Sequence, residues 1–518
     1  MCGIIGEICK EGNKVDIGIR AKRLLRNLQH RGHESAGITV TDGQNVSTKK
    51  GTGEVIEAIP KRWAFRKEGL AAIGQVRYST TGSSVPKDNR AISLSESEVS
   101  YEELHEHEKS PGAKSSQPFF HDSTFQGRCA LVHNGNLTNA SSLKSSLIEK
   151  GIDFEGSSDS EVILKLLCYL IDAEKLEVLE AIQKTMTKIK GAFSCIFLTK
   201  KGLWVFRDKK GFRPLKVAET KDSFIFASED CAWHNRQAKF LRDVMPGEII
   251  EVRIGKKDLI FHKPPEKKHR LAVCVFEYIY LMAFYSWGVA KIRTLLGKRL
   301  FHHHPFPGIV IPVMTSGEGG ALGYHMAQSQ EFPGRSFYFP ALYKNPLVGR
   351  TFLEPKQIER IHKNRSKYFF LFDAIRESIY ELAKTEKKIF ITLIDDSLIR
   401  GNVSRTIIKL VRAELKKLCP DIYKKIRIIW LLTSPPYKSP CYFGIDTYEK
   451  KELIAANRDI EGIRKSINAS YVGYLPLEDM LEIAAEVLEI ELSDFCEACF
   501  SGNYPIPIDP EQIKMSLK

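Results

Sequence analysis

Long apolar runs are scarce in this sequence of 518 residues. No apolar stretch of the kind that a secretory signal needs follows Met1, so we expect a cytoplasmic protein. The longest apolar run, residues 271–290, nearly reaches the length of a membrane span, but Glu277 interrupts it. A buried strand that leads into a helix explains this run better, and we expect no membrane association.

A concentrated stripe of basic residues is also missing, and so are internal repeats. The net charge of +14 is compatible with nucleic acid, a membrane surface or phosphate-bearing small molecules as partners. The basic residues are dispersed along the chain, with only short clusters such as residues 267–270. We therefore expect a solvated surface with anion-binding sites, and no nucleic-acid partner.

The cysteines lack the spacing of a disulfide framework. There are 11 of them, an odd number, irregularly placed and without an extracellular context. This favours reduced thiols, some of them bound to metal. Six are expected to be ordinary small core residues, namely Cys9, Cys129, Cys168, Cys195, Cys231 and Cys419.

The length exceeds that of a single core, so two domains are expected. Residues 261–270 are polar and contain Pro-Pro, which places the boundary there and gives domains at 2–262 and 270–518. Residues 84–116 are polar and without periodicity, as in a long exposed insertion.

The two halves differ in their hydrophobic patterns. The first predicts short strands, as at 129–137 and 223–230, with a helix over 158–171 and a hairpin over 244–255. The second alternates apolar runs with helical patterns, which predicts a parallel sheet. Its strands are expected at 308–314 and 389–397, and its helices at 315–328 and 400–415.

Cys2 directly follows the initiator methionine. Its small side chain permits removal of Met1, which would leave a thiol and a free α-amine on one residue. A thiol that attacks an amide needs a base, an oxyanion hole and groups that hold the substrate. The α-amine can serve as the base, and Asn134 with the Gly135 N–H could form the oxyanion hole.

Two further residues suit a small zwitterionic substrate. Arg77 could hold a carboxylate with two parallel hydrogen bonds, and Asp159 could hold an ammonium group. Plainer explanations exist for each candidate. Asn-Gly is usually a turn, Asp159 could be only a helix cap, and a single arginine usually lies on the surface. The residues alone leave both explanations open.

Seven short segments of the first half resemble the class II glutamine amidotransferases. They are MCGIIG, LQHRGHESAGI, GQVRYSTTG, QPF, LVHNGNL, SDSE and GFRPL, and their order is similar to that of the amidophosphoribosyltransferase family, which opens purine synthesis. The resemblance implies the four-layer αββα fold of N-terminal-nucleophile hydrolases. It also implies that Cys2 is the nucleophile, that Arg77 and Asp159 bind the carboxylate and amine of glutamine, that Asn134 and Gly135 form the oxyanion hole, and that Arg31 lies near the thiol.

In the second half, two adjacent carboxylates, Asp395 and Asp396, follow a predicted strand. Ligands of open α/β sheets bind at this end of the strands, where carboxylates can hold ribose hydroxyls and hydrated Mg²⁺. The turn over 397–404 leads into a helix, whose N–H groups suit a phosphate. A strand end capped by acidic residues is the simpler alternative.

This segment resembles the phosphoribosylpyrophosphate (PRPP) motif of type I phosphoribosyltransferases, and the resemblance continues through FEYIY, KN..VGRTF and FGIDT. It implies a parallel-sheet phosphoribosyltransferase domain, an α/β fold after an α+β glutaminase. Glutamine and PRPP would be the substrates, and ammonia would pass between the two sites. The implied PRPP-binding residues are Ser316, Lys344, Arg350, Asp395, Asp396, Ser397, Arg400 and Gly401, with Mg²⁺ at Ser316, Asp395 and Asp396.

The second half departs from that pattern in several phosphate-binding loops. Several of these changes remove a hydroxyl, a carboxylate or a cation, which would weaken PRPP binding. Two alternatives follow: a glutaminase that serves another acceptor, or a second domain that only binds nucleotides or a partner. The departures are Met314 and Thr315 for Pro-Asp, Pro346 and Leu347 for Arg-Tyr, and Asn402 and Val403 for Thr-Thr.

Cys496 and Cys499 form a CxxC pair, which alone indicates zinc, a redox pair or coincidence. Together with Cys274 and Cys441 they match the ligand positions of the [4Fe–4S] subtype of the family. The resemblance thus implies a structural or oxygen-sensing cluster. A Cys₄ zinc site and four buried cysteines are the alternatives. We also expect a homo-oligomer.

Overall fold

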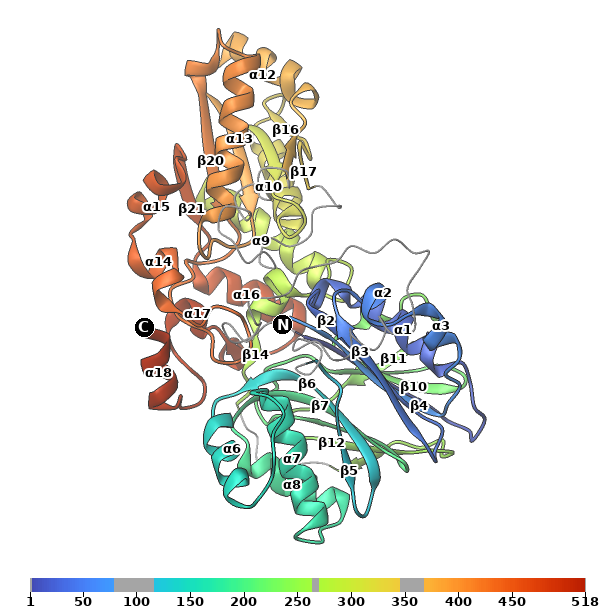
Figure 1. Ribbon diagram of the computed structural model, residues 1–518. Helices are drawn as coiled ribbons and strands as arrows, with labels where there is room; N and C mark the ends of the chain where they lie inside the picture. The colour runs from blue at the N-terminus through green and yellow to red at the C-terminus, as the bar shows by residue number, and fades with distance from the viewer. Residues whose placement is uncertain (1, 79–115, 263–269, 345–367, 518) are drawn as a thin grey trace. The chain divides into compact units, whose positions relative to one another are not determined.

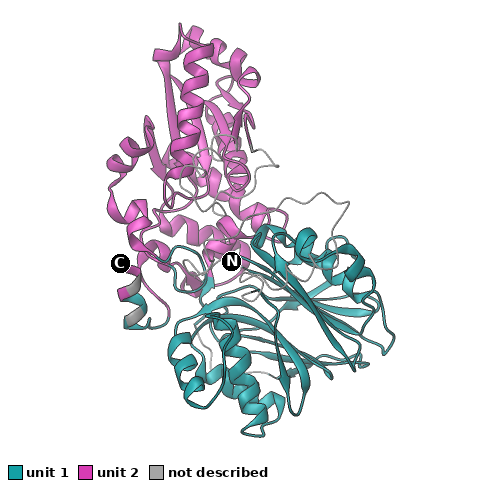
Figure 2. Cartoon of the chain, in the orientation of Figure 1, with its two compact units in different colours: residues 1–273, 441–448, 506–513 teal, residues 274–440, 449–505, 514–518 magenta. Residues whose placement is uncertain are grey.

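The computed structural model describes residues 2–78, 116–262, 270–344 and 368–517 (Figure 1). The chain forms two compact units (Figure 2). The first comprises Met1–Val273, Cys441–Tyr448 and Ile506–Ile513, and the second comprises Cys274–Pro440, Glu449–Pro505 and Lys514–Lys518. Nearly all of the predicted insertion and most of the predicted boundary segment lie outside the described residues.

The first unit contains two antiparallel sheets, one of seven strands and one of six. The seven-stranded sheet pairs β11 (Lys239–Asp243), β9 (Lys216–Glu219), β10 (Ser223–Ala227), β1 (Gly3–Cys9), β4 (Ala71–Arg77), β2 (Ser35–Thr41) and β3 (Val46–Thr52), in that order. The six-stranded sheet pairs β13 (Ile260–His262), β12 (Ile249–Arg253), β8 (Gly202–Arg207), β7 (Gly191–Thr199), β6 (Gly127–Leu137) and β5 (Phe119–Ser123).

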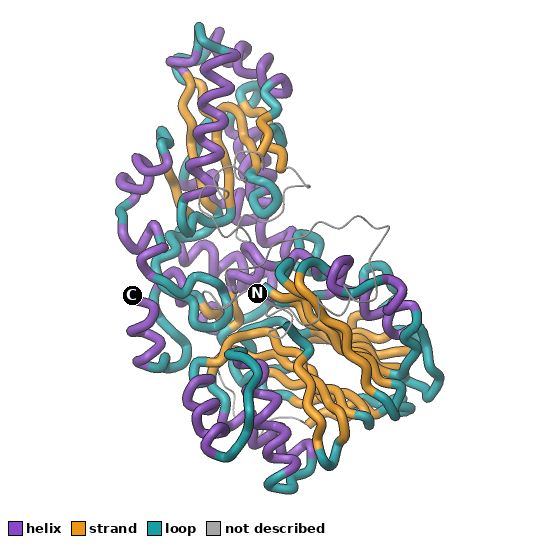
Figure 3. Tube along the Cα trace, viewed as in Figure 1, coloured by secondary structure: helices purple, strands orange, loops and turns teal. Residues whose placement is uncertain are grey.

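Alternation along the strands explains how these sheets are covered. In β6, Ala130 and Val132 point into the cluster between the sheets, whereas Cys129 and Leu131 point into the cluster under the helices. The helices cover the outer faces, so the unit is a four-layer αββα sandwich (Figure 3), and the predicted fold is confirmed. They are α1 (Ile17–Asn27), α2 (Val55–Ala58) and α3 (Lys61–Phe65) on one side, and α6 (Ala140–Glu149), α7 (Asp159–Asp172) and α8 (Val178–Lys188) on the other.

The hairpin predicted over 244–255 is wrong in its bounds. Residues 244–248 instead carry the chain from β11 in one sheet to β12 in the other. Val244 donates its N–H to the Leu215 carbonyl at 2.8 Å, and the side chain of Glu248 accepts from the Met245 N–H. The true hairpin is β12–β13, because β12 pairs with the strand that follows it.

The second unit is built on the predicted parallel sheet. Its strands pair in the order β16 (Ser336–Tyr338), β15 (Gly308–Pro312), β19 (Ile389–Asp395), β20 (Ile426–Leu432) and β21 (Tyr471–Tyr474). Two small ribbons pair β14 (Val273–Cys274) with β22 (Phe495–Cys496) and β17 (Leu342–Lys344) with β18 (Tyr368–Phe370). The longer helices are α9 (Val289–His303), α10 (Glu318–Glu331), α12 (Asp373–Thr385), α13 (Asn402–Leu418), α15 (Ile460–Ile467) and α16 (Leu477–Leu488), and the shorter ones are α14 (Ile454–Asn457), α17 (Ala498–Ser501) and α18 (Pro510–Leu517).

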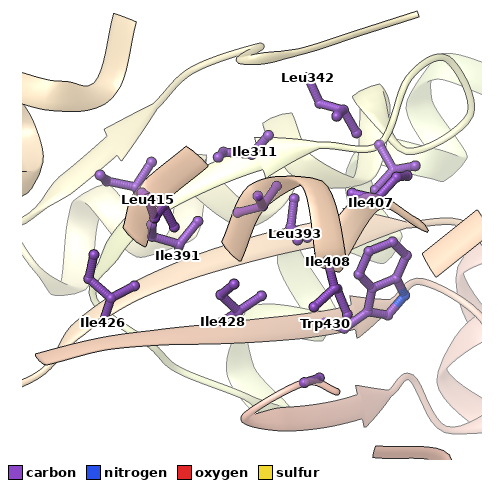
Figure 4. Packing of buried hydrophobic residues seen from close by; sticks show 14 of the residues in the cluster. Ile311, Leu342, Ile391, Leu393, Ile407, Ile408, Leu415, Ile426, Ile428 and Trp430 are labelled. Carbon is purple, nitrogen blue, oxygen red and sulfur yellow. The ribbon is translucent and has the colours of Figure 1, made fainter. Parts of the chain in front are cut away.

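The main core of this unit lies where α12 and α13 cover one face of the sheet. Figure 4 shows Ile407, Ile408 and Leu415 of α13 beside the side chains of β19 and β20, among them the fully buried Trp430. Apolar residues of α13 recur at spacings of three and four, so they form a single stripe along the helix. This packing holds β19 rigidly, and β19 carries the acidic pair at its carboxyl end.

The apolar run at 271–290 forms less regular structure than predicted. Only the two residues of β14 are extended, Glu277–Leu281 form a turn of π-helix, and α9 begins at Val289. Phe276 and Ile279 are fully buried, which accounts for the run's apolar character. Among the described residues, no helix has the length and hydrophobicity needed to cross a membrane.

Lys50 of β3 is a half-buried cation that anchors the chain entering β5. Its Nζ donates to the Ser116 carbonyl at 2.8 Å and lies 5.1 Å from the centre of the Phe119 ring. Burial lowers the pKa of Lys50 from 10.5 to about 8, although Glu155 and Glu161 act in the opposite direction.

We expect Lys50 to make stability depend on pH. Between pH 8 and 10.5 the unfolded chain keeps a proton that the folded chain has lost. The free energy of unfolding should therefore rise with pH through this window, by about 1–3 kcal/mol. The Lys50→Met variant should lack this rise, and the neighbouring Lys49→Met, on the opposite strand face, should keep it. Thermal unfolding at pH 7.5, 9 and 10.5 measures the difference, and equal slopes in all three proteins would refute it.

Candidate functional site

Cys2 lies at the start of β1, in the interior of the seven-stranded sheet. Its side chain is buried, and the Sγ lies 3.9 Å from the Tyr78 carbonyl oxygen. Gly3 and Val76 form the last pair of the antiparallel β1–β4 ladder, so Cys2, just before β1, and Arg77, the last residue of β4, both lie at that end of the two strands. Two predicted site residues thus meet at the same end of two adjacent strands. Arg77 is half-buried there.

Arg31 fixes the backbone of the nucleophile and does not lie free beside the thiol. Its Nε donates to the Cys2 carbonyl at 2.9 Å, and its Nη1 donates to the carboxylate of Glu229. Both side chains of this ion pair are fully buried. A buried pair of this kind is costly to break, because either partner alone would be an uncompensated charge.

Asn134 lies in the middle of β6, opposite Ser194 of β7. Its side chain is fully buried, yet neither its Nδ2 nor its Oδ1 has a hydrogen-bond partner within the described part of the chain. Buried amides without partners are rare in folded proteins, since each such group loses its hydrogen bonds to water. An amide donor that no protein group uses is suited to a ligand oxygen.

Gly135 is part of the same strand, so its Asn-Gly pair is not a turn. Its φ of 155° and its close approach to β7 both require glycine, because a Cβ here would lie 2.0 Å from the Ala192 carbonyl oxygen. The position next to Asn134 therefore cannot hold a residue with a side chain.

Replacement of Asn134 tests this arrangement. We expect Asn134→Ala to lower the kcat of glutamine hydrolysis by about 10²–10³, the usual effect of losing one oxyanion donor, with little change in stability. Asn136→Ala is the matched control: its Nδ2 donates to the Tyr442 carbonyl at 2.8 Å, so that variant should lose about 1–3 kcal/mol of stability. Steady-state kinetics and thermal unfolding separate the two, and an unchanged kcat in Asn134→Ala would contradict the assignment.

Asp159 is the first residue of α7, but Ser158 is the residue that caps this helix. The Ser158 Oγ accepts from the Ser160 N–H, which leaves the Asp159 carboxylate for another role. Its Oδ2 accepts from the Leu137 N–H at 3.0 Å. This bond ties Asp159 to the end of the strand that carries Asn134 and Gly135.

Sequence reasoning missed a buried polar network beneath these residues. The His133 Nδ1 lies 3.0 Å from the Ser160 Oγ, and the Gln117 Nε2 donates to that same Oγ at 2.7 Å. The Ser160 hydroxyl also lies 3.3 Å from the Asp159 Oδ1. The network therefore links the neighbours of Asn134 and Asp159. A histidine within an apolar strand was its only local signal.

In the second unit, Asp395 and Asp396 lie at the carboxyl end of β19, as predicted. They are 9% and 3% exposed. The Asp396 N–H donates to the Asp395 Oδ1 at 3.0 Å, and the Ser397 hydroxyl donates to the Asp396 carboxylate. Burial raises the pKa of both carboxyls, and the charge of Asp396 raises that of Asp395 further. A bound cation would relieve this strain.

Ser316 lies near the acidic pair, and its hydroxyl acts to lower the pKa of Asp396, against the effect of burial. The adjacent Gly317 brings the loop against β19: a Cβ there would lie 2.2 Å from the Ile394 carbonyl oxygen. Arg293 of α9, which sequence reasoning missed, is 4% exposed and its charge favours ionised Asp396. The sequence offered one indication of this role: Arg293 is a charged residue on an otherwise apolar helix face.

Arg400 and Gly401 precede α13, where a phosphate was predicted. Gly401 is the N-cap residue of this helix and has a φ of 76°. Arg400 pairs with Glu452, its Nε lying 2.7 Å from the Oε2. Lys344 ends β17, and the placement of its side chain, like all of Arg350, lies outside the described residues.

None of the eleven cysteines forms a disulfide in the described part of the chain. Cys274 and Cys496 lie on β14 and β22, which pair with each other. Cys499 lies in α17, and its carbonyl accepts two backbone N–H groups from the residues just before Pro440. Cys441 begins the segment Cys441–Tyr448 and is the least buried cysteine of the chain.

Comparison with known proteins decides the family. The glutamine amidotransferase domain family matches residues 106–235. The amidophosphoribosyltransferase of Methanothermobacter thermautotrophicus is 34% identical over 513 residues, covering 98% of this chain and 95% of the relative. That of Bacillus subtilis is 31% identical over 500 residues, covering 95% and 92%. The chain belongs to the amidophosphoribosyltransferase family.

Solved structures agree with this membership. The glutamine phosphoribosylpyrophosphate amidotransferase of B. subtilis, complexed with ADP and GMP, has a TM-score of 0.79 at 29% identity and covers 98% of each chain. A structure described as the allosteric regulatory enzyme of purine biosynthesis has a TM-score of 0.80 at 29% identity.

Amidophosphoribosyltransferases are glutamine amidotransferases and pentosyltransferases, and they carry out the glutamine-dependent first step of purine biosynthesis. The predicted family, fold and enzyme class are therefore confirmed. Another ammonia acceptor, or a second domain without catalytic function, is not favoured.

Proposed function

We propose that Cys2 is the nucleophile that takes ammonia from glutamine. Removal of Met1 frees the α-amine, which accepts the thiol proton as the Sγ attacks the side-chain amide carbon. Collapse of the tetrahedral intermediate breaks the C–N bond, and the amine returns the proton to the leaving ammonia. The γ-glutamyl thioester that remains is hydrolysed by water to glutamate and free Cys2. The buried, unpartnered amide of Asn134 is the observation that best supports this proposal.

The groups around Cys2 have distinct roles in this proposal. The Asn134 Nδ2 and the Gly135 N–H donate to the oxyanion of the tetrahedral intermediate. Arg77, at the same end of the β1–β4 ladder as Cys2, pairs with the α-carboxylate of glutamine, and Asp159 pairs with its α-ammonium. Arg31 positions the Cys2 backbone through its hydrogen bond to the carbonyl oxygen.

In the second unit, we propose that ammonia attacks C1 of PRPP, displacing pyrophosphate and giving 5-phosphoribosylamine. Asp395 and Asp396 would hold Mg²⁺ and the ribose hydroxyls, with Ser316 close to the same carboxylates. A pair of buried carboxylates whose pKa values are raised fits a hard cation, because it replaces their repulsion with attraction. When bound, Mg²⁺ would neutralise charge on the leaving pyrophosphate.

Other PRPP contacts are proposed by position. Gly401, Ser397 and the start of α13 would take the 5′-phosphate at a helix N-terminus. Arg400 would have to exchange Glu452 for a phosphate oxygen to take part. Lys344 and Arg350 would bind pyrophosphate.

We also propose that Cys274, Cys441, Cys496 and Cys499 hold a [4Fe–4S] cluster of structural or oxygen-sensing function. The donor set fits, because four reduced thiols can supply the four thiolates that such a cluster needs. A Cys₄ zinc site would use the same donors. Analysis of iron, sulfide and zinc, with the visible absorbance of anaerobically purified protein, distinguishes the two. The cytoplasmic location and the homo-oligomer remain predictions.

A coupled assay tests the two reactions together. Purified protein given glutamine, PRPP and Mg²⁺ should release glutamate and pyrophosphate in equal amounts. Mass spectrometry should show a chain that begins at Cys2, and a glutamine-like electrophile should label Cys2. Glutamate without pyrophosphate would refute the transferase assignment. Retained Met1, or label at another residue, would refute the role of Cys2.

A further inference from the structure

Three chemically different ligand groups converge behind the nucleophile. The His30 Nε2 lies 2.9 Å from the Glu229 Oε1, and the Cys231 Sγ lies 3.6 Å from the Glu229 Oε2. One nitrogen, one oxygen and one sulfur atom from these residues all lie within 4.8 Å of one another. Nothing in the sequence brings them together, since His30 and Glu229 are 199 positions apart.

The cluster is buried but open on one side. Glu229 and Cys231 are 0% and 1% exposed, whereas the His30 side chain keeps 28% of its exposure. His30 lies in the turn Gln29–Arg31 after α1, and Cys231 lies in the turn Asp230–Trp233, which packs against α1. An ion could therefore enter past the imidazole and meet the carboxylate and the thiol behind it.

The donor set indicates the kind of ion. Mg²⁺ and Ca²⁺ take oxygen ligands, whereas Zn²⁺ and similar ions combine imidazole, carboxylate and thiolate. Three protein ligands with room for water are typical of zinc sites that exchange their fourth ligand. Cys231, expected from the sequence to be an ordinary core residue, is part of this set.

We propose that His30, Glu229 and Cys231 form a second metal site, which takes a thiophilic divalent cation such as Zn²⁺ and inhibits glutamine hydrolysis when filled. The link is Arg31, which pairs with Glu229 and also donates to the Cys2 carbonyl. A cation on Glu229 competes with the guanidinium of Arg31, so occupancy loosens the hold of Arg31 on the backbone of Cys2. The inhibitory part rests on the proposed role of Cys2, and the binding part does not.

Binding is tested with Co²⁺ as a spectroscopic substitute for Zn²⁺, in full-length protein carrying Cys2→Ala so that the nucleophile cannot bind the ion. In protein whose four-cysteine site already holds its metal, titration should show one equivalent of Co²⁺ with a thiolate charge-transfer band. Adding Cys231→Ser should remove that band, adding His30→Asn should weaken binding at least tenfold, and adding Cys419→Ser, a buried thiol of the second unit, should change nothing. Identical titrations with and without Cys231 would overturn the proposal, and His30→Asn tests it independently should Cys231→Ser fail to fold.

Inhibition is tested with Cys2 intact. Micromolar Zn²⁺ should lower the glutaminase activity of the wild type reversibly, with recovery on adding EDTA, and Cys231→Ser should need at least tenfold more Zn²⁺ for the same loss. Equal inhibition of both proteins would show that Zn²⁺ acts elsewhere, and would overturn the coupling. A wild type that binds Co²⁺ through Cys231 but never hydrolyses glutamine would instead refute the proposed function and leave the metal site standing.

Discussion

The Cys2→Ala variant is expected to lose glutamine-dependent activity by at least about 10⁴-fold, because removal of a nucleophile leaves only binding and the oxyanion hole. Its ammonia-dependent synthesis of phosphoribosylamine should stay close to that of the wild type, since the proposed PRPP site consists of residues of the second unit. Pyrophosphate release, measured first with glutamine and then with ammonium chloride at pH 8.5, separates the two activities.

Cys9 provides a matched control within the same strand. It lies at the other end of β1 and is equally buried, and burial raises its pKa to about 12, so it stays a neutral thiol. Cys9→Ala should retain glutaminase activity apart from a modest loss of stability. Full activity of Cys2→Ala with glutamine, or an equal loss in Cys9→Ala, would contradict the assignment of the nucleophile.

The reciprocal result is expected for the acidic pair of the second unit. Asp395→Asn combined with Asp396→Asn should lower transferase activity by about 10²–10⁴, if each carboxylate contributes about 1.5–3 kcal/mol of charge-assisted binding. Glutamine hydrolysis at Cys2 should continue, so glutamate would accumulate without pyrophosphate. Removing two buried like charges should also leave the unit at least as stable as before, because each repels the other.

Calorimetry with Mg²⁺ and PRPP distinguishes lost binding from lost chemistry in this variant. We expect the heat of binding to disappear, whereas Asp373→Asn, an exposed carboxylate in the first turn of α12, should bind as the wild type does. Unchanged affinity in the double variant would mean that the ligand lies elsewhere in the unit.

Local patterns in the sequence predict the elements that carry the site. Two strands are identified by their apolar residues, β6 around Val132 and β19 before Asp395. The acidic pair lies at the carboxyl end of β19, where the pattern predicts it. The helix predicted over 158–171 also forms, with Asp159 as its first residue. The alternative explanation of Asp159 as a helix cap is wrong, because Ser158 makes the capping hydrogen bond. These successes depend on interactions between near neighbours in the chain.

Contacts between distant segments are what the sequence does not predict. The convergence of His30, Glu229 and Cys231 depends on how α1 packs against a turn some 200 residues later. The Asn134 amide lacks partners because of the residues that pack around it from several segments, and the hydrophobic periodicity of the sequence does not predict that packing. The same holds for the crossing from β11 to β12, where one turn joins two sheets and the spacing alone resembled a hairpin.

The departures in the phosphate-binding loops now have a structural setting. Ser316, which remains beside the changed residues Met314 and Thr315, still acts to lower the pKa of Asp396, and Gly317 still allows the loop to meet the end of β19. The acidic pair, Ser316 and Gly317 are thus all retained, although other residues of the phosphate-binding loops differ from the family pattern.

The return of residues 441–448 to the first unit has a consequence for synthesis on the ribosome. Arg213 is completely enclosed, and two of its nitrogens donate to the Phe443 carbonyl at 3.0 and 2.6 Å. Until that carbonyl leaves the exit tunnel, the nascent chain must keep this guanidinium hydrated or bound by a chaperone. The amidotransferase half, although translated first, would reach its final form only after residues 441–448 and 506–513 have been made.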